Sequence, residues 1–245
     1  MQYVKVNGLI MSKRKTIQGH LIVIEGSDGS GKATQTRRLV RRLRAEGGAV
    51  ESLAFPGYKR SFFGHMVGAY LRGEYGTHEA VDPRLAAVLY AADRWEARDK
   101  IADWLAEGKV VVCDRYVDSN KAHQAARLPA GADRKAFARW IDRLEYGVFG
   151  MPRPSGTVFL HVPHTVAEGL IEKKGRRAYL RGKRRDAHES DIGHLQRAED
   201  LYVALASRRS GGRVIRIECM ADGQLLSKSA IAEKVYDAAQ RILNS

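Results

Sequence analysis

The sequence predicts an α/β fold in which a five-stranded, mostly parallel sheet is flanked by helices. Short, β-branched apolar runs recur five times along the chain, and a helical pattern follows each of them. Glycine and proline mark several boundaries between these segments. Because strand, helix and strand in succession form the unit of a parallel sheet, five such repeats predict a single sheet covered by helices.

The expected strands and helices alternate along the whole chain. The strands are expected at 21–25, 49–55, 109–113, 157–162 and 213–217. The helices are expected at 32–46, 62–72, 83–107, 117–127, 133–146, 164–172, 187–207 and 225–243. Gly47-Gly48 suits a left-handed helix end, two later helices stop at Gly73 and Gly108, and Asp82 followed by Pro83 suits a helix start.

Length and composition predict one domain with an extension. The chain has 245 residues, of which 44% are hydrophobic, enough for a sizeable core. No apolar run approaches the ~20 residues that span a membrane. Residues 1–18 are polar and basic, lack the apolar stretch of a secretory signal, and contain a second candidate start at Met11. We expect a flexible extension over 1–18 and a single domain over 19–245.

Cysteine content and charge bear on location and partners. Cys113 and Cys219 lie far apart after apolar runs, so we expect buried free thiols and a cytoplasmic protein. The 42 basic and 28 acidic residues give a formal charge of +14, which favours phosphate-bearing or polyanionic partners without choosing among them. Eight basic residues and no acidic ones fall in 173–185, KKGRRAYLRGKRR.

The stretch "LIVIEGSDGSGKATQ" (21–35) predicts a phosphate-binding loop between a strand and a helix, rather than an ordinary glycine turn. Gly26, Gly31 and Lys32 keep the G-x-x-x-x-G-K spacing. Backbone amides and the helix N-terminus can then approach phosphate oxygens, while Lys32 reaches the β- and γ-phosphates. The expected ATP-binding residues are Gly26, Ser27, Asp28, Gly29, Ser30, Gly31, Lys32, Ala33 and Thr34.

One residue of this loop departs from the usual pattern. Ala33 stands where a hydroxyl residue usually contacts Mg²⁺. The metal would then be held by substrate phosphates, water and carboxylates elsewhere, while Thr34 still offers its hydroxyl to the α-phosphate. Asp28 is unusual inside an ATP-binding loop and indicates that a second ligand lies close by.

Polar residues at two further strand ends predict the other side of the site. Asp114-Arg115-Tyr116 ends a buried strand, and ligands of open α/β sheets lie beyond the carboxyl ends of the strands. Asp114 could order magnesium-bound water and Arg115 could hold a phosphate, unless the pair is a surface salt bridge. "AFPGY" (54–58) follows another strand and supplies a rigid aromatic wall.

Tyr90 and Arg94 are four residues apart in an expected helix and share one face. An aromatic ring and a guanidinium placed in this way can stack on a base and hydrogen-bond its carbonyl. Taken alone, such a pair is more typical of core packing with a solvated arginine.

Together these stretches resemble the thymidylate kinases, which belong to the nucleoside monophosphate kinases of P-loop NTPase fold. The matching segments are "EGSDGSGKATQ", "FPGY", "YLRGEYG", "AADR", "DRYVDSNKAHQ" and "DAHESD…HL…Y", in the family's order over about three-quarters of the chain. The resemblance implies Mg²⁺-dependent transfer of the γ-phosphoryl group of ATP to dTMP, giving dTDP and ADP. It also implies a homodimer with a parallel five-stranded sheet.

The resemblance implies roles for individual residues as well. Asp28 would lie near the sugar 3′-hydroxyl and the metal, and Arg115 would hold the dTMP phosphate. Tyr90 would stack on thymine and Arg94 would bond its carbonyl. The remaining nucleotide contacts would come from Phe55, Pro56, Tyr58, Ser119, Asn120, His123 and Gln124. The family commonly has Tyr or Phe near His123, a difference that bears on discrimination against a ribose 2′-hydroxyl.

The basic segment is interpreted as a lid over about 173–186. Phosphoryl transfer spreads negative charge over the transferred oxygens, and cations must cover it. In this family the covering arginine comes from the P-loop or from a lid, and the P-loop position here is the neutral Gly29. Arg176, Arg177 and Arg181 are then the candidates. The alternatives are a solvated basic face and a nucleic-acid patch.

The expected catalytic residues are Asp28, Lys32, Arg115, Arg176 and Arg181, and the expected metal-binding residues are Asp28, Asp114 and, through water, Glu189. No strong general base is required, because the acceptor phosphate oxygen is already ionised. Two other functions remain open: a P-loop kinase for another nucleotide or a nucleoside, and a polyanion-binding P-loop protein without kinase activity. No membrane partner is expected, and the sequence has no recognisable nucleic-acid-binding module.

Overall fold

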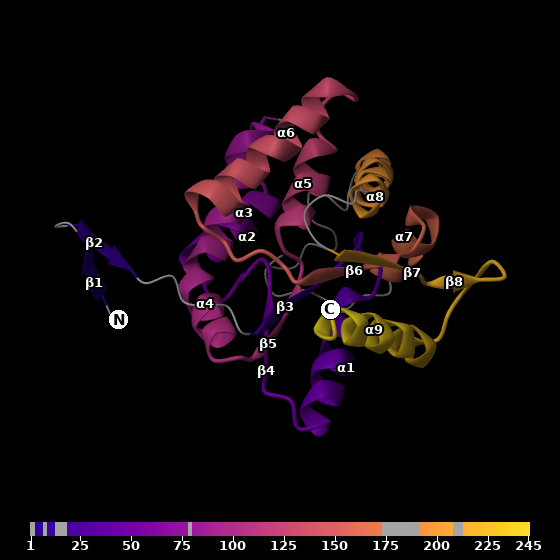
Figure 1. Ribbon diagram of the computed structural model, residues 1–245. Coiled ribbons are helices and arrows are strands. Elements are labelled where there is room, and N and C mark those ends of the chain that lie inside the picture. Colours follow the sequence, from indigo (N-terminus) through magenta and orange to yellow (C-terminus); the bar gives the residue numbers. More distant parts are fainter. Residues whose placement is uncertain (1–2, 7–8, 13–18, 78–79, 173–191, 208–212) are drawn as a thin grey trace.

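The computed structural model describes residues 3–6, 9–12, 19–77, 80–172, 192–207 and 213–245. A five-stranded sheet forms its centre (Figure 1). The strands are β3 (His20–Glu25), β4 (Val50–Ala54), β5 (Val110–Asp114), β6 (Gly156–His161) and β7 (Arg213–Glu218). They lie in the order β4-β5-β3-β6-β7, and all four pairings are parallel. The predicted α/β fold is confirmed.

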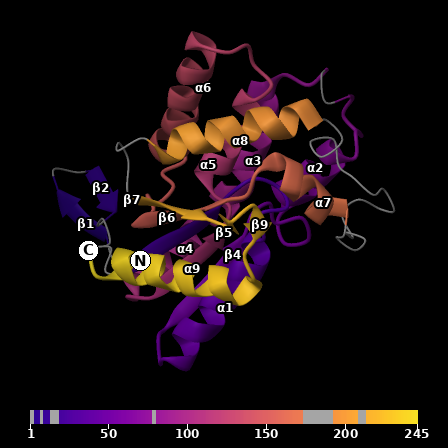
Figure 2. The same cartoon turned by 90° about the vertical axis from the view of Figure 1, so that its right-hand side faces the viewer.

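Helices cover both faces of the sheet, as Figure 2 shows from the side. One face packs against α1 (Lys32–Ala45) and α9 (Lys228–Leu243), with Leu39, Leu43 and Val235 in its core. The other face carries α3 (Pro83–Glu96), α4 (Arg98–Ala106), α5 (Val117–Ala125), α6 (Ala132–Asp142) and α8 (Ile192–Ala206). Helix α2 (Phe62–Leu71) packs on α3, and α7 (His164–Glu172) follows β6.

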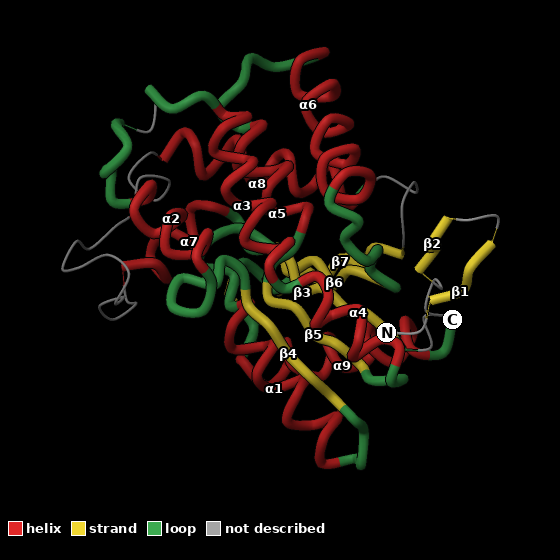
Figure 3. The backbone as a smooth tube through the Cα atoms, turned by 90° about the vertical axis from the view of Figure 1, so that its left-hand side faces the viewer, coloured by secondary structure: helices red, strands yellow, loops and turns green. Residues whose placement is uncertain are grey.

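The position of β3 explains its sequence and places the site. Its residues Leu21–Glu25 are all buried, because β3 is the middle strand and both of its faces are covered by helices. β3, β5 and β4 lie side by side (Figure 3) and run in the same direction, so their carboxyl ends meet at one edge of the sheet. The predicted phosphate-binding loop and the Asp114-Arg115 pair therefore lie at the same edge.

Three helix boundaries differ from the prediction. The helix expected over 83–107 is two helices, because the chain turns at Ala97, whose amide bonds Arg94 O rather than continuing the α-helical pattern. After Asp142 the helix expected over 133–146 continues as the π-helix η1 (Arg143–Val148). The last helix starts at Lys228 rather than 225, because the short strands β8 (Met220–Ala221) and β9 (Gln224–Leu225) pair before it.

Within the extension 1–18, the structure describes an antiparallel pair of strands, β1 (Tyr3–Val6) and β2 (Leu9–Ser12). They form a two-stranded sheet of their own, which lies apart from the central sheet in Figure 1. The flexibility of the extension stays a prediction. Among the described helices, none combines the length and the apolar character needed to cross a bilayer.

Candidate active site

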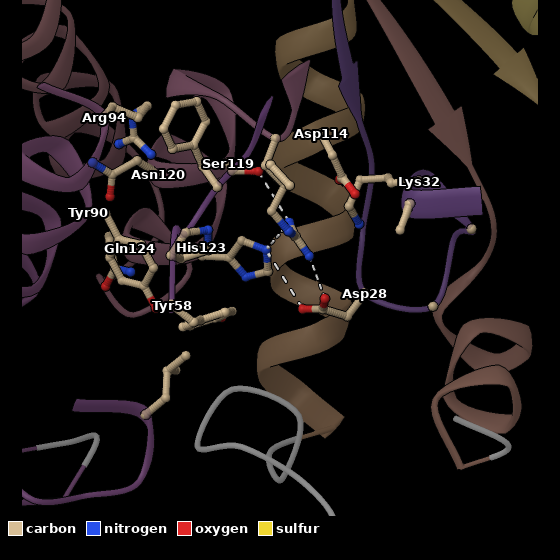
Figure 4. A pocket seen from close by; sticks show the side chains of 18 of the residues that line it. Asp28, Lys32, Tyr58, Tyr90, Arg94, Asp114, Ser119, Asn120, His123 and Gln124 are labelled. Carbon is tan, nitrogen blue, oxygen red and sulfur yellow. Dashed lines mark hydrogen bonds and ion pairs between the residues drawn. The ribbon is translucent and has the colours of Figure 1, made fainter. Parts of the chain in front are cut away.

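A cavity of about 350 Å³ lies at the carboxyl ends of β3, β4 and β5 (Figure 4). Its wall includes predicted residues from four separate stretches: Asp28, Gly29, Gly31, Lys32, Ala33, Thr34, Phe55, Pro56, Tyr58, Tyr90, Arg94, Asp114, Arg115, Ser119, Asn120, His123 and Gln124. Ala54 and Leu71 also line it and were not predicted. Gly26, Ser27 and Ser30 belong to the loop but are not lining residues. Arg176, Arg177, Arg181 and Glu189 lie outside the described residues.

Glycines shape the loop between β3 and α1. Gly29 and Gly31 have φ angles of +85° and +87°, in the region that side-chain-bearing residues avoid. A Cβ atom on Gly29 would also lie 2.5 Å from the carbonyl oxygen of Ala167 in α7. An arginine at this position would therefore require both a strained backbone and a displaced helix, which explains why the loop is neutral here.

Lys32 and the start of α1 give one end of the cavity a positive potential. The buried Lys32 Nζ donates to the carbonyls of Gly26 and Ser27 at 2.9 and 2.7 Å, so the ammonium group lies over the loop. The N-cap residue Gly31 has no capping side chain, and the first turn of α1 contains no acidic residue. A helix N-terminus of this kind beside a lysine suits an anion.

Arg115 lines the cavity and contacts residues of the loop, α5 and α8. Its Nη2 bonds Asp28, and its Nη1 lies 3.2 Å from Ser119 Oγ, His123 Nε2 and Tyr202 Oη. The φ angle of Arg115 is +67°, a backbone conformation that costs about 1–3 kcal/mol for a residue other than glycine. These contacts therefore hold the guanidinium in a fixed position at a strained turn.

His123 is neutral in this environment. Burial and the adjacent Arg115 hold the pKa of His123 well below its usual range. Because arginine only donates, Nε2 of His123 accepts from Arg115, and the ring proton is assigned to Nδ1. The ring stacks on buried His194 of α8, with centroids 5.8 Å apart, and Nε2 lies 3.9 Å from Asp28. His123 thus lies beside the Arg115–Asp28 pair.

Arg94, Asn120 and Tyr90 lie at the other end of the cavity, away from Lys32 (Figure 4). Glu145, which is 0% exposed, accepts two 2.5 Å hydrogen bonds from Arg94, which is 2% exposed. The interpretation of Arg94 as a solvated arginine is therefore wrong. Asn120 Nδ2 donates to the same carboxylate at 2.9 Å and to Ala87 O at 3.0 Å.

These bonds fix the orientation of the Asn120 amide. Both hydrogens of Nδ2 are used, and Oδ1 has no hydrogen-bond partner among the described residues. Glu145 engages Nε and Nη2 of Arg94, so Nη1 is not used by that carboxylate, and the side chains of Arg94 and Asn120 lie next to each other in Figure 4. This end of the cavity therefore presents one fixed donor and one fixed acceptor.

The aromatic wall is held by a buried carboxylate next to Arg94. Asp93 accepts from the amide of Gly57 at 2.9 and 3.1 Å and from Ser61 Oγ. Burial raises the pKa of Asp93. Tyr90 packs edge-on against Tyr70, with ring centroids 6.4 Å apart. The 55–58 stretch and Tyr90 are therefore positioned by residues outside the cavity.

The carboxylates of Asp28 and Asp114 both line the cavity. Within the described part of the chain, no three His, Cys, Asp or Glu side chains form a group that could hold a metal by themselves. Mg²⁺ commonly takes only one or two carboxylates and completes its shell with substrate phosphates and water. The two aspartates fit this mode of binding, and Ala33 contributes no ligand to it.

Sequence reasoning did not assign three residues that shape the site: Glu25, Glu145 and Tyr202. Glu25 carried a usable signal, because it is a carboxylate that ends an apolar strand directly before the loop. Glu145 had none, since it reaches Arg94 from a position 51 residues away. Tyr202 was only the last residue of the matched segments, and its contact with Arg115 spans 87 residues.

Comparisons with known proteins point to one family. The family model described as thymidylate kinase matches residues 24–219. A thymidylate kinase from Mycobacterium tuberculosis is 39% identical over 193 residues, covering 79% of this chain and 88% of the relative. One from Caulobacter vibrioides is 34% identical over 222 residues, covering 89% and 96%. The solved structure of Candida albicans thymidylate kinase has a TM-score of 0.68 at 22% identity and covers 93% of each chain, so it shares the fold.

Proposed function

The chain belongs to the thymidylate kinase family, and we propose that the described cavity is where it phosphorylates dTMP to dTDP with ATP. One observation carries this assignment. A single cavity connects an anion-binding loop, at Lys32, to a buried donor and acceptor, at Arg94 and Asn120. Asp28 and His123, which contact Arg115, lie between these two ends. The base of a nucleotide requires the donor and the acceptor, its phosphate requires Arg115, and the phosphates of ATP require the loop with Lys32.

The base end matches thymine. Thymine presents a carbonyl acceptor, O4, beside an N–H donor, N3, and these complement Arg94 Nη1 and Asn120 Oδ1. Cytosine presents a donor and an acceptor in the opposite order, so it would place donor against donor and acceptor against acceptor. Such mismatches in a buried site are costly. Tyr90 stacks on the base, with Phe55, Pro56 and Tyr58 as the wall and Ser119, His123 and Gln124 toward the sugar.

The phosphate end suits transfer between two phosphates. Arg115 binds the dTMP phosphate, and Lys32 exchanges its loop carbonyls for β- and γ-phosphate oxygens of ATP. A dTMP phosphate oxygen bonds to the γ-phosphorus while the bond from that phosphorus to the β–γ bridging oxygen breaks. The acceptor oxygen is already ionised, so no side chain has to remove a proton. Mg²⁺, held by Asp28 and Asp114, would neutralise phosphate charge when bound.

The transferred phosphoryl group requires further positive charge. One cation that lines the cavity, Arg94, is engaged with Glu145 at the base end. In the loop, position 29 has no space for an arginine. We therefore assign the covering charge to the lid, about 173–186, with Arg176 and Arg181 as catalytic residues and Arg177 beside them. Glu189 would reach the metal through water.

We also propose a cytoplasmic homodimer. Leu85, Val88 and Trp95 share one face of α3 and are 65%, 36% and 43% exposed, so this apolar stripe suits contact with a second copy. Leu85→Glu should produce monomers in light scattering, whereas Leu225→Glu, at an exposed site on β9, should not. Both cysteines are buried free thiols, which supports a reducing compartment, and recovery in a secreted fraction would contradict this location.

The test of function is an ADP-release assay with ATP and Mg²⁺. The acceptors are dTMP, dUMP, UMP, CMP, AMP, GMP and thymidine, each offered separately. We expect the highest kcat/KM for dTMP, weaker turnover of dUMP and little of CMP. A preference for a cytosine or purine nucleotide would overturn the assignment of Arg94 and Asn120. Absence of turnover with every acceptor would overturn the enzymatic function.

A further inference from the structure

Glu25 is a buried carboxylate beside the cavity, and it is not one of the lining residues. It ends β3, is 1% exposed, and receives hydrogen bonds from three residues. Oε1 accepts from the amides of Tyr116 and Ser119 at 2.8 and 3.1 Å. Oε2 accepts from Ser119 Oγ at 2.7 Å and from Tyr202 Oη at 3.2 Å. Four donor groups thus lie around one carboxylate that does not line the cavity.

The two amide bonds cap a helix from a different element. Helix α5 starts at Val117, and its N-cap residue, Tyr116, provides no side-chain cap. Glu25 takes that place from β3, since it accepts from an amide at the N-cap and another in the first turn. The capped segment directly follows Arg115, whose backbone is in the left-handed region. Glu25 therefore holds the chain immediately after the strained residue.

The two hydroxyl bonds act on the Arg115 side chain. Ser119 Oγ donates to Oε2 of Glu25, and the single proton of Tyr202 Oη has two acceptors, Ser119 Oγ at 2.8 Å and Oε2 at 3.2 Å. Because both protons are directed within the group formed by Glu25, Ser119 and Tyr202, each hydroxyl turns a lone pair toward Arg115 Nη1, 3.2 Å away. The carboxylate thus determines which way two of the acceptors of Arg115 face.

We propose that Glu25 is a positioning residue for binding of the acceptor phosphate, acting through Arg115. It fixes the backbone after Arg115 by capping α5, and it fixes the side chain of Arg115 by orienting the hydroxyls of Ser119 and Tyr202. This inference rests on the proposed function, in which Arg115 binds the phosphate of dTMP. It assigns to Glu25 a share of the affinity that depends on that phosphate and none of the affinity for the base.

The test compares two ligands that differ only in the phosphate. Dissociation constants for dTMP and for thymidine are measured by calorimetry on the full chain and on Glu25→Gln. The glutamine amide would place a donor toward Ser119 Oγ, which forces the hydroxyl proton toward Arg115. We expect dTMP to bind roughly ten- to a hundredfold more weakly, the range of one charge-assisted hydrogen bond, with thymidine changed less than twofold. Equal losses for both ligands, or no loss, would overturn the proposal.

Two further variants keep the test decisive. Tyr202→Phe retains the ring that stacks on Phe159 and removes only the hydroxyl. If Glu25→Gln fails to fold, Tyr202→Phe must show the same selective loss of dTMP affinity, about three- to tenfold. Glu96→Gln is the matched control, because Glu96 accepts from the amides of Phe62 and Phe63 at the start of α2, away from Arg115. It should leave both dissociation constants unchanged, and a selective loss of dTMP there would contradict the inference.

Arg115→Met separates this inference from the proposed function. If it leaves the ratio of the two dissociation constants unchanged, Arg115 does not bind the phosphate and the proposed function of that residue fails. If the thymidine dissociation constant divided by that of dTMP falls for Arg115→Met and not for Glu25→Gln, only the role of Glu25 is refuted.

Discussion

Replacing Glu145 by leucine should destabilise the fold and impair base recognition together. Glu145 is fully buried, with two 2.5 Å hydrogen bonds from Arg94 and one of 2.9 Å from Asn120. Glu145→Leu leaves a buried guanidinium without its counter-charge, which costs about 3–5 kcal/mol of unfolding free energy. For a chain of this size each kcal/mol lowers Tm by about 2–4 °C, so the expected decrease is about 6–20 °C.

The substitution also releases the Asn120 amide. In the native protein, Glu145 and Ala87 O take both hydrogens of Asn120 and leave its oxygen for N3–H of thymine. Without Glu145 the amide can rotate and offer a donor instead, so the ratio of kcat/KM for dTMP over dCMP should fall by roughly tenfold, the value of one mismatched hydrogen bond.

Thermal unfolding followed by circular dichroism and the ADP-release assay with both acceptors check these two expectations. Asp99→Leu is the control for stability, because its partner Arg98 lies at the surface and exposed pairs contribute about 0–1 kcal/mol. The double variant Arg94→Met/Glu145→Leu should be more stable than Glu145→Leu alone, since the buried guanidinium that lost its partner is then absent. An unchanged Tm for Glu145→Leu, or an unchanged acceptor ratio, would refute the reasoning.

Further predictions concern Lys32, the lid arginines and His123. Lys32→Ala should abolish turnover and leave dTMP binding nearly intact by calorimetry; loss of both would mean that the two substrates do not occupy separate ends of the cavity. Arg176→Ala and Arg181→Ala should lower kcat more than KM in steady-state assays, and wild-type rates in both would remove the lid assignment. His123→Tyr should raise the preference for dTMP over its ribonucleotide, and an equal ratio would place His123 away from the sugar. Folding lowers the pKa of His123 from its ordinary 6.5, so below pH 6.5 the unfolded chain binds more protons than the folded chain. The free energy of unfolding therefore decreases as the pH is lowered, by up to about 1.4 kcal/mol per pH unit. His123→Phe should flatten this slope in denaturant unfolding at pH 5–7, and an identical slope would contradict a depressed pKa.

The sequence by itself predicted the order of strands and helices, because the apolar periods and the glycine boundaries are local properties. It also placed the loop 26–34 and the Asp114-Arg115 pair at one sheet edge, since parallel strands bring their carboxyl ends together. It missed the turn at Ala97, where neither glycine nor proline separates α3 from α4. At Arg94 the residues taken alone left a solvated arginine open, because its burial depends on a distant partner.

Only the tertiary structure decided what holds the site residues in place. Glu145 reaches Arg94 across 51 residues, and Tyr202 reaches Arg115 across 87, distances at which no local pattern links the partners. Glu25 precedes the loop in the sequence, yet it acts on α5, 91 residues later, because β3 and β5 pair side by side. Buried polar groups must find partners wherever the fold brings them. The residues expected to contact the nucleotides were therefore available from local sequence, whereas the residues that orient them emerge only from folding.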